Sequence, residues 1–134
     1  MPQPFTTRLT VTVGDLNYGA HVGNDRFLLF FHEARLRFLA ESGYSELDIG
    51  DGVGLIMSEA HVKYLAQVGM GEDLDVEVNI SDLGKIRFTM NYRIVKADGK
   101  TAAEGWTILT SFDYQNKKLT RLPKEFVDKY SVSE

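Results

Sequence analysis

Residues 26–39, RFLLFFHEARLRFL, are one of the most apolar runs in the chain and predict its central element. Plotted at about 100° per residue, one helical stripe collects five side chains: Phe27, Phe30, Phe31, Ala34 and Phe38. Several leucines fall outside that stripe, so the first half of the helix is apolar nearly all round. Such a helix is normally enclosed by other structure. We therefore expect a central helix over residues 25–42, ending before Gly43.

Alternation of apolar and polar residues predicts half-buried strands around this helix. It is clearest in residues 74–81 and 85–95, which a short turn separates. A strand over residues 101–114 follows the Asp98-Gly99 turn, with Trp106, Ile108 and Phe112 on one face. Residues 52–68 predict another long strand, and the first half of this strand breaks the alternation. A bulge, or a strand covered on both faces, would explain that break.

The two ends of the chain complete the predicted order of elements. Residues 7–13 predict a short first strand, and residues 123–130, opened by a proline, predict a terminal helix. The fold class is therefore α+β, an antiparallel sheet of about five strands curled around one long helix. With 134 residues the chain is most simply one domain, residues 1–134. Such a sheet leaves an edge strand open, so we expect a homodimer or homotetramer.

Composition excludes several classes of function. The formal net charge of -4 and the lack of a basic run argue against binding to nucleic acid or to an anionic membrane surface. No apolar stretch reaches the length of about 18 residues that spans a bilayer, and no signal peptide is recognisable. The chain has no cysteine, which removes disulfides and thiolate chemistry. A cytoplasmic protein is the expectation.

Short motifs of common enzyme classes are absent or incomplete. HEARL (residues 32–36) begins like a zinc-protease helix, but Leu36 stands where the second histidine ligand is needed, so no metal is expected. GDGVG opens a strand rather than a helix, and it therefore offers no phosphate cradle. The sequence contains neither a GxSxG motif nor a P-loop.

One polar loop, DLNYGAHVGND (residues 15–25), leads directly into the apolar helix. It is either an ordinary loop with a helix cap or a site, because N–H groups at a helix N-terminus can polarise a carbonyl without a charged side chain. The N–H groups of Gly23 and Asn24 are the predicted donors. A glycine at position 23 would also let a substrate approach the backbone closely.

The order of these pieces resembles the hotdog-fold acyl-CoA thioesterases, in the branch typified by 4-hydroxybenzoyl-CoA thioesterase. That branch has a loop of the form D-x-D-x-x-G-H-V-x-N, then a helix with an E-A-R segment, an aromatic-rich strand and a G-D/E turn. The matching pieces here are DLNYGAHVGN, HEARLRFL, VKYLAQVGMGEDLDVEV and RFTMNYRIV. The resemblance implies the hotdog fold and hydrolysis of an acyl-CoA or acyl-carrier thioester. No cofactor is expected, since coenzyme A would be part of the substrate.

The catalytic residues predicted with the help of this resemblance are Asn17, His21, Asp25 and Glu33. Asn17 replaces the family's usual aspartate, which bears on whether hydrolysis occurs, because an amide cannot act as nucleophile or general base near neutral pH. It can orient a water or bond a thioester carbonyl. Asp25 is the nearest carboxylate to the predicted N–H donors, with a helix cap as its ordinary interpretation. For Glu33 the ordinary interpretation is an ion pair with Arg37.

The other residues predicted at the site bind substrate or shape the loop. His21 lies inside the polar loop, where its side chain would orient the loop or the thioester. The alternative is a structural histidine that donates a hydrogen bond to a backbone carbonyl. The predicted substrate-binding residues are Asp15, Gly23, Asn24 and Tyr64. Asp15 would brace the loop rather than react, and Tyr64 would pack on the helix.

Two other functions stay open on the sequence alone. GDLN followed by a histidine is similar to the G-D-x-N-P-x-H loop of hotdog enoyl-CoA hydratases, although Tyr18 replaces the proline and one extra residue precedes His21. A non-catalytic acyl-CoA or acyl-carrier binding module is the third possibility, and the missing aspartate at position 17 supports it.

Overall fold

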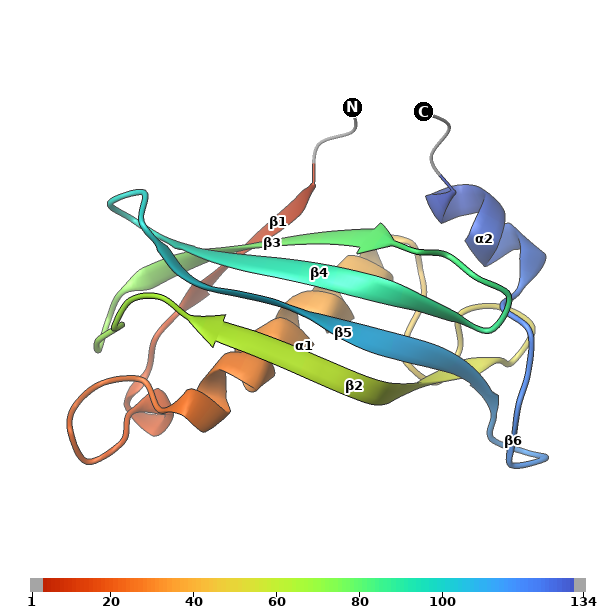
Figure 1. Cartoon of the computed structure of the whole chain (residues 1–134), viewed down its shortest axis with the longest axis horizontal. Helices are drawn as coiled ribbons and strands as arrows, with labels where there is room; N and C mark the ends of the chain where they lie inside the picture. The colour runs from red at the N-terminus through yellow and green to blue at the C-terminus, as the bar shows by residue number, and fades with distance from the viewer. Residues whose placement is uncertain (1–3, 132–134) are drawn as a thin grey trace.

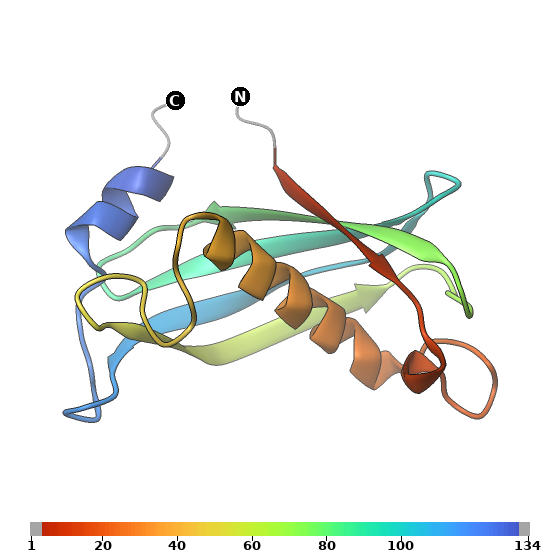
Figure 2. The ribbon, with the colours of Figure 1, turned by 180° about the vertical axis from the view of Figure 1, so that it is seen from behind.

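One long helix, α1 (Asn24–Glu41), crosses the inner face of an antiparallel sheet (Figures 1 and 2). The computed structural model describes residues 4–131. The strands are β1 (Phe5–Thr10), β2 (Gly54–Tyr64), β3 (Asp73–Ser81), β4 (Arg87–Lys96), β5 (Thr101–Asp113) and β6 (Lys118–Leu119). A short 3-10 turn, η1 (Val13–Asp15), precedes the polar loop, and α2 (Lys124–Tyr130) lies at the far end of the sheet.

The sheet has the strand order β1-β3-β4-β5-β2, with β6 added to β5, so β1 and β2 are its edges. This confirms the α+β hotdog architecture and the element order predicted from the sequence. The helix was predicted over residues 25–42 and is displaced by one residue. The first strand ends at Thr10 rather than at residue 13, because the chain turns into η1 and the Thr12 N–H donates to the Asp15 carboxylate at 2.9 Å.

The break in alternation along β2 is a bulge. The pairing of β2 with β5 shifts register between Met57 and Glu59, so Ser58 is an extra residue on the β2 side. Leu55 and Met57 therefore share the inner face with Ala60 and the later even-numbered residues, opposite β5 positions that face α1. One inserted residue accounts for the parity change seen in the sequence.

The core forms where α1 presses on β3, β4 and β5. Phe31 is fully buried and stacks on the Tyr92 ring at 4.3 Å between ring centroids. A Cβ on Gly105, beneath it, would lie 3.0 Å from the Phe31 ring and would collide with the His61 carbonyl. The buried side chains of β5 are accordingly small or polar near this point, whereas Trp106 and Ile108 share the outer face of the sheet, away from α1.

The helix is not enclosed within one chain, contrary to the expectation from its composition. Its sheet-facing residues Phe27, Phe31 and Ala34 are buried, but Leu28, Leu29 and Leu36 are 36%, 46% and 39% exposed. At about 100° per residue, Leu29 and Leu36 lie on the side of α1 opposite the sheet-facing residues, whereas Leu28 lies about a quarter turn from them. Within the same described range, no helix combines the length and apolar character needed to cross a bilayer.

Candidate active site

The N-terminus of α1 is open. Gly23 is the N-cap residue, and no side chain of residues 4–131 caps the helix, so the cap interpretation of Asp25 is wrong. The Gly23 N–H donates to the Asp15 carbonyl at 3.3 Å, and the Arg26 N–H donates to the Gly23 carbonyl at 2.9 Å. In residues 4–131 the N–H groups of Asn24 and Asp25 have no hydrogen-bond acceptor. The two available donors are therefore Asn24 and Asp25, one residue further along than the predicted pair.

A pocket of about 270 Å³ opens beside these N–H groups. Its lining comes from the end of the polar loop, the first turn of α1 and the end of β2: Val22, Asn24, Phe27, Tyr64, Leu65, Ala66 and Gln67. The Tyr64 hydroxyl donates to the Asn24 carbonyl at 3.1 Å, and its ring meets the Phe27 ring edge-on at 5.3 Å. Tyr64 thus packs on the helix as predicted and forms one wall of the pocket, 46% exposed.

The polar loop is folded by its own hydrogen bonds. The Asn17 side-chain oxygen accepts the Gly19 N–H at 2.8 Å, and the Asn17 N–H donates to the His21 carbonyl at 2.8 Å. Ala20 adopts a left-handed backbone conformation, φ 65°, to make this turn. These bonds reverse the direction of the chain, so that the last residues of the polar loop lie beside its first residues.

Asn17, Gly23 and Asp25, which we call the loop cluster, lie together at the N-terminus of α1. Gly23 and Asp25 are the chain neighbours of Val22 and Asn24, which line the pocket. A Cβ built on Gly23 would be 2.7 Å from the Asp25 carboxylate oxygen and 3.8 Å from the Asn17 Cβ. Both side chains therefore flank the same face of Gly23, and a Cβ at this position would displace the Asp25 carboxylate. The sequence predicted these three residues as site residues, and the fold brings them together.

Asp15 and His21 support the loop through bonds of a different kind. The Asp15 carboxylate accepts the Thr12 N–H and lies 3.4 Å from the Arg26 guanidinium, so it braces the loop as predicted. The His21 backbone forms a bridge with Gly69, while its exposed side chain has no hydrogen-bond partner among the described residues. A substrate role for either side chain stays a prediction.

Glu33 is not brought to the loop cluster within one chain. Its carboxylate pairs with Arg37 at 2.9 Å, and Arg37 also donates to the Thr7 hydroxyl and the Arg8 carbonyl of β1. Glu33 lies nine residues beyond Asn24, about 13 Å along the helix axis. The geometry matches the ion-pair interpretation, so it gives a catalytic role for Glu33 no support.

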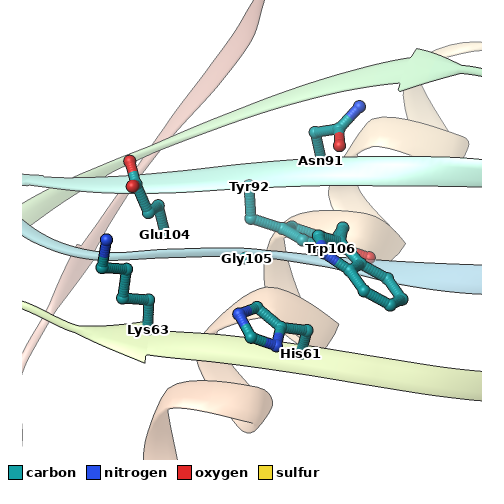
Figure 3. Close-up of a pocket in the computed structure, with 7 residues that line it drawn as sticks. All are labelled: His61, Lys63, Asn91, Tyr92, Glu104, Gly105 and Trp106. Carbon is teal, nitrogen blue, oxygen red and sulfur yellow. The ribbon is translucent and has the colours of Figure 1, made fainter.

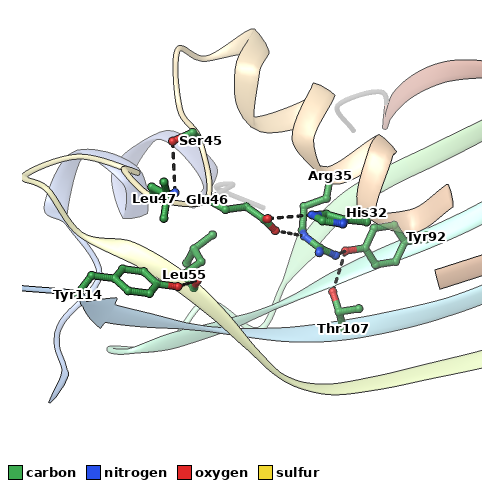
Figure 4. A network of polar contacts seen from close by, with 9 residues as sticks. All are labelled: His32, Arg35, Ser45, Glu46, Leu47, Leu55, Tyr92, Thr107 and Tyr114. Carbon is green, nitrogen blue, oxygen red and sulfur yellow. Dashed lines mark hydrogen bonds and ion pairs between the residues drawn. The ribbon is translucent and has the colours of Figure 1, made fainter. Parts of the chain in front are cut away.

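A second polar group, the core network, lies further along α1 (Figure 4). Its members come from α1, the loop before β2, β4 and β5: His32, Arg35, Glu46, Tyr92 and Thr107. Arg35, only 5% exposed, donates to Glu46 at 2.6 Å and to the Tyr92 hydroxyl at 3.0 Å, and Tyr92 bonds Thr107 at 2.7 Å. The His32 ring nitrogen lies 2.9 Å from the other Glu46 oxygen.

The core network keeps Glu46 and Arg35 in their charged forms. Burial opposes ionisation of Glu46, but the hydrogen bonds and charges of Arg35 and His32 outweigh it and lower the pKa of that carboxyl. Burial also opposes the charge on Arg35, and its partners Tyr92 and Glu46 nevertheless raise its pKa. Sequence reasoning missed this network, although an arginine on the sheet-facing side of an apolar helix is a signal that a buried partner must exist.

A second pocket, of about 360 Å³, lies on the outer face of the sheet (Figure 3). His61 and Trp106 stack beside it with ring centroids 5.5 Å apart, and Lys63, Asn91 and Glu104 line the rest of its rim. Lys63 and Tyr64 are neighbours on opposite faces of β2, so this pocket and the loop cluster are on opposite sides of the sheet. Within residues 4–131, no three His, Asp or Glu side chains are grouped as metal ligands.

Comparison with known proteins gives a consistent match over most of the chain. The sequence model of the thioesterase-like superfamily matches residues 11–130. A proposed esterase from Aquifex aeolicus (strain VF5) is 24% identical over 126 residues, which cover 93% of this chain and 96% of that protein.

Solved structures with the same fold include a complex with CoA and a CoA thioesterase. A hypothetical protein of Staphylococcus aureus, solved in complex with CoA, has a TM-score of 0.87 and 22% identity, covering 96% of this chain and 82% of the other. A 1,4-dihydroxy-2-naphthoyl-CoA thioesterase from Synechocystis has a TM-score of 0.83 and 23% identity, covering 96% and 98%. At these identities, the likeness establishes the common fold.

Proposed function

Because the chain belongs to the thioesterase-like superfamily, we propose that it hydrolyses acyl-CoA thioesters at the N-terminus of α1. The observation that carries the proposal is the pair of unbonded N–H groups, Asn24 and Asp25, beside a pocket with aromatic and aliphatic walls. A thioester carbonyl placed there would accept both hydrogen bonds. Each such donor aimed at a developing oxyanion is worth roughly 2.7–4 kcal/mol of transition-state stabilisation in known enzymes.

The loop cluster supplies the remaining groups for hydrolysis. A water held by the Asn17 amide and the Asp25 carboxylate attacks the carbonyl carbon, and Asp25 takes its proton. The tetrahedral oxyanion is bound by the two N–H groups, and its collapse breaks the carbon–sulfur bond. Asp25 then returns the proton to the leaving thiolate, so the products are a free acid and CoA. In this scheme Asp25 does the work of the aspartate that is missing at position 17, and no cofactor takes part.

A second copy of the chain would cover the surfaces that one copy leaves open. The edge strand β2 has free pairing capacity on one side, and Met57, Tyr64 and Leu65 beside it are about half exposed. Leu29 and Leu36 of α1 add a further exposed apolar surface. We infer a homodimer built along β2, whose partner would close the pocket. The place of action we propose is the cytoplasm.

The test is release of CoA from a panel of acyl-CoA thioesters, from acetyl through long-chain to aromatic, followed with a thiol-detecting dye. The protein has no cysteine and adds no thiol background. Turnover of at least one thioester, reduced by about 10²-fold or more in Asp25→Asn, is the expected result. Binding of acyl-CoA without turnover of any member would instead support a binding module.

The hydratase interpretation is not favoured. It needs Asp15 and a histidine as an acid–base pair, whereas the Asp15 carboxylate is already bonded to the Thr12 N–H and paired with Arg26. The family model that matches residues 11–130 is also that of the thioesterase-like superfamily. Hydration of crotonyl-CoA that disappears in Asp15→Asn would reverse this conclusion.

A further inference from the structure

The core network interrupts an otherwise apolar surface between α1 and β2. Starting from the pocket at Tyr64, the inner face of β2 presents Val62, Ala60 and Met57, and Met57 is 49% exposed. On the helix side, Leu28 follows Phe27 and is 36% exposed. One turn beyond Leu28 the surface becomes polar, at His32, whose side chain is 42% exposed.

His32 cannot easily turn away from this position. Its ring nitrogen is held by Glu46, whose other oxygen is held by Arg35. Arg35 is buried and anchored in turn on Tyr92. The lowered pKa of Glu46 means that the carboxylate stays charged near neutral pH. An alkyl chain laid over this pair would desolvate a charge without offering it a hydrogen bond, which is strongly unfavourable.

We propose that the His32–Glu46 pair is the stop that limits the length of the acyl group, an inference that rests on the proposed thioester site at the start of α1. The acyl chain runs from the Asn24 and Asp25 N–H groups, over Phe27 and Leu28 on one side and Tyr64 and Ala60 on the other. It ends where His32 begins. The substrates are thus medium-chain acyl groups, or aryl-acyl groups of similar length.

The distance along α1 from Asn24 to His32 sets the longest acyl chain that we expect to fit. Asn24 and His32 are eight residues apart, which is about 12 Å at the rise of an α-helix. An extended alkyl chain covers about 1.25 Å per bond, given carbon–carbon bonds of about 1.5 Å. Chains up to about eight to ten carbons therefore fit before the stop. Each added methylene within that range improves affinity by up to about fourfold, the equivalent of ~0.8 kcal/mol.

The experiment measures binding of S-(2-oxoalkyl)-CoA ketones, in which a methylene group separates sulfur from carbonyl, so that no hydrolysis is needed. Calorimetric Kd values for alkyl chains of 4 to 16 carbons are compared among the unmodified protein, His32→Leu and the control His61→Leu. His61 lies on the outer face of the sheet, where its loss removes the same side chain from a different surface.

In the unmodified protein and in His61→Leu, we expect affinity to increase with chain length up to about ten carbons. Longer chains should bind no more tightly than that. In His32→Leu the rise continues, with at least a tenfold gain at 14 carbons. In this variant an apolar side chain of similar size replaces the polar ring between the alkyl chain and Glu46, and Glu46 keeps its ion pair with Arg35 at 2.6 Å. Identical length profiles in all three proteins overturn the stop. Failure to hydrolyse any thioester, with the length profiles as expected, overturns only the proposed hydrolysis.

Discussion

Two polar groups, the core network and the loop cluster, lie at different points along α1 and differ in how many of their polar atoms form hydrogen bonds. The core network is closed: Arg35 is buried and bonded to Glu46 and Tyr92, and Thr107 completes the chain. The loop cluster is open: Asp25 is exposed, and the first N–H groups of α1 have no acceptor within residues 4–131. A polar group that is fully bonded in the core holds the fold, whereas one left unbonded beside a pocket is available to a substrate.

The largest expected effect is on stability, from the core network. Arg35→Ala leaves the partly buried Glu46 carboxylate without its strongest partner, so we expect a loss of about 3–5 kcal/mol in the free energy of unfolding. Urea denaturation measures it. Arg93→Ala is the matched control, because Arg93 forms an exposed ion pair with Glu77 and its loss should cost about 1 kcal/mol or less. Equal losses in the two variants would contradict the distinction.

The next effect is on activity, from the loop cluster. Asp25→Asn keeps the size of the side chain but removes the base, and we expect kcat to fall by about 10²-fold or more. The free energy of unfolding should change by about 1 kcal/mol or less, the contribution of one exposed carboxylate in the first turn of a helix. Steady-state kinetics and urea denaturation on the same preparation separate the two quantities. Unchanged kcat would exclude Asp25 as the base.

Lowering the pH should reduce the stability that the core network contributes, because it protonates Glu46. The pKa of Glu46 is lower in the folded protein than its ordinary value, so its ionised form stabilises the fold above the ordinary glutamate pKa of about 4.3. That stabilisation is lost as the pH falls through the lowered pKa. Unfolding free energies measured from pH 6 to pH 3 should therefore fall more steeply in the unmodified protein than in Glu46→Gln. Parallel curves would show that Glu46 contributes nothing.

A smaller effect is expected from Tyr64, in the wall of the pocket. Tyr64→Phe removes the hydrogen bond to the Asn24 carbonyl but keeps the ring against Phe27. The loss of one such bond corresponds to roughly 0.5–1.5 kcal/mol, hence at most about a tenfold fall in kcat/KM. If the fall exceeded 10²-fold, Tyr64 would have to act on the substrate directly.

The smallest effect is predicted for Glu33. Its exposed pair with Arg37 should contribute about 0.3–0.5 kcal/mol to stability, and Glu33→Gln should leave kcat within twofold of the unmodified protein. The same thiol-release assay checks this. A large loss of kcat would show that Glu33 reaches a site on a second copy of the chain.

The sequence predicted the parts of this molecule that depend on local pattern. Alternation identified β3, β4 and β5, and the polar loop identified Gly23 and Asp25 as candidates at a helix start. Asn17 was predicted from the family resemblance, and only the fold shows that it lies beside the other two. The sequence could not show which face of β5 carries Trp106, because both faces of that strand bear apolar residues. It also could not pair Arg35 with Glu46, since that contact depends on a loop without periodicity. The exact N–H donors depended on whether Gly23 was already bonded, which only tertiary structure decides.

The most direct test of the central claim is a titration of the ¹⁵N-labelled protein with an S-(2-oxoalkyl)-CoA ketone, followed by amide chemical shifts. Binding at the start of α1 predicts the largest shifts at the Asn24 and Asp25 N–H groups, with smaller shifts at Tyr64 and Leu65. Largest shifts at His61 and Trp106, with Asn24 and Asp25 unmoved, would place the ligand in the outer pocket and contradict the account.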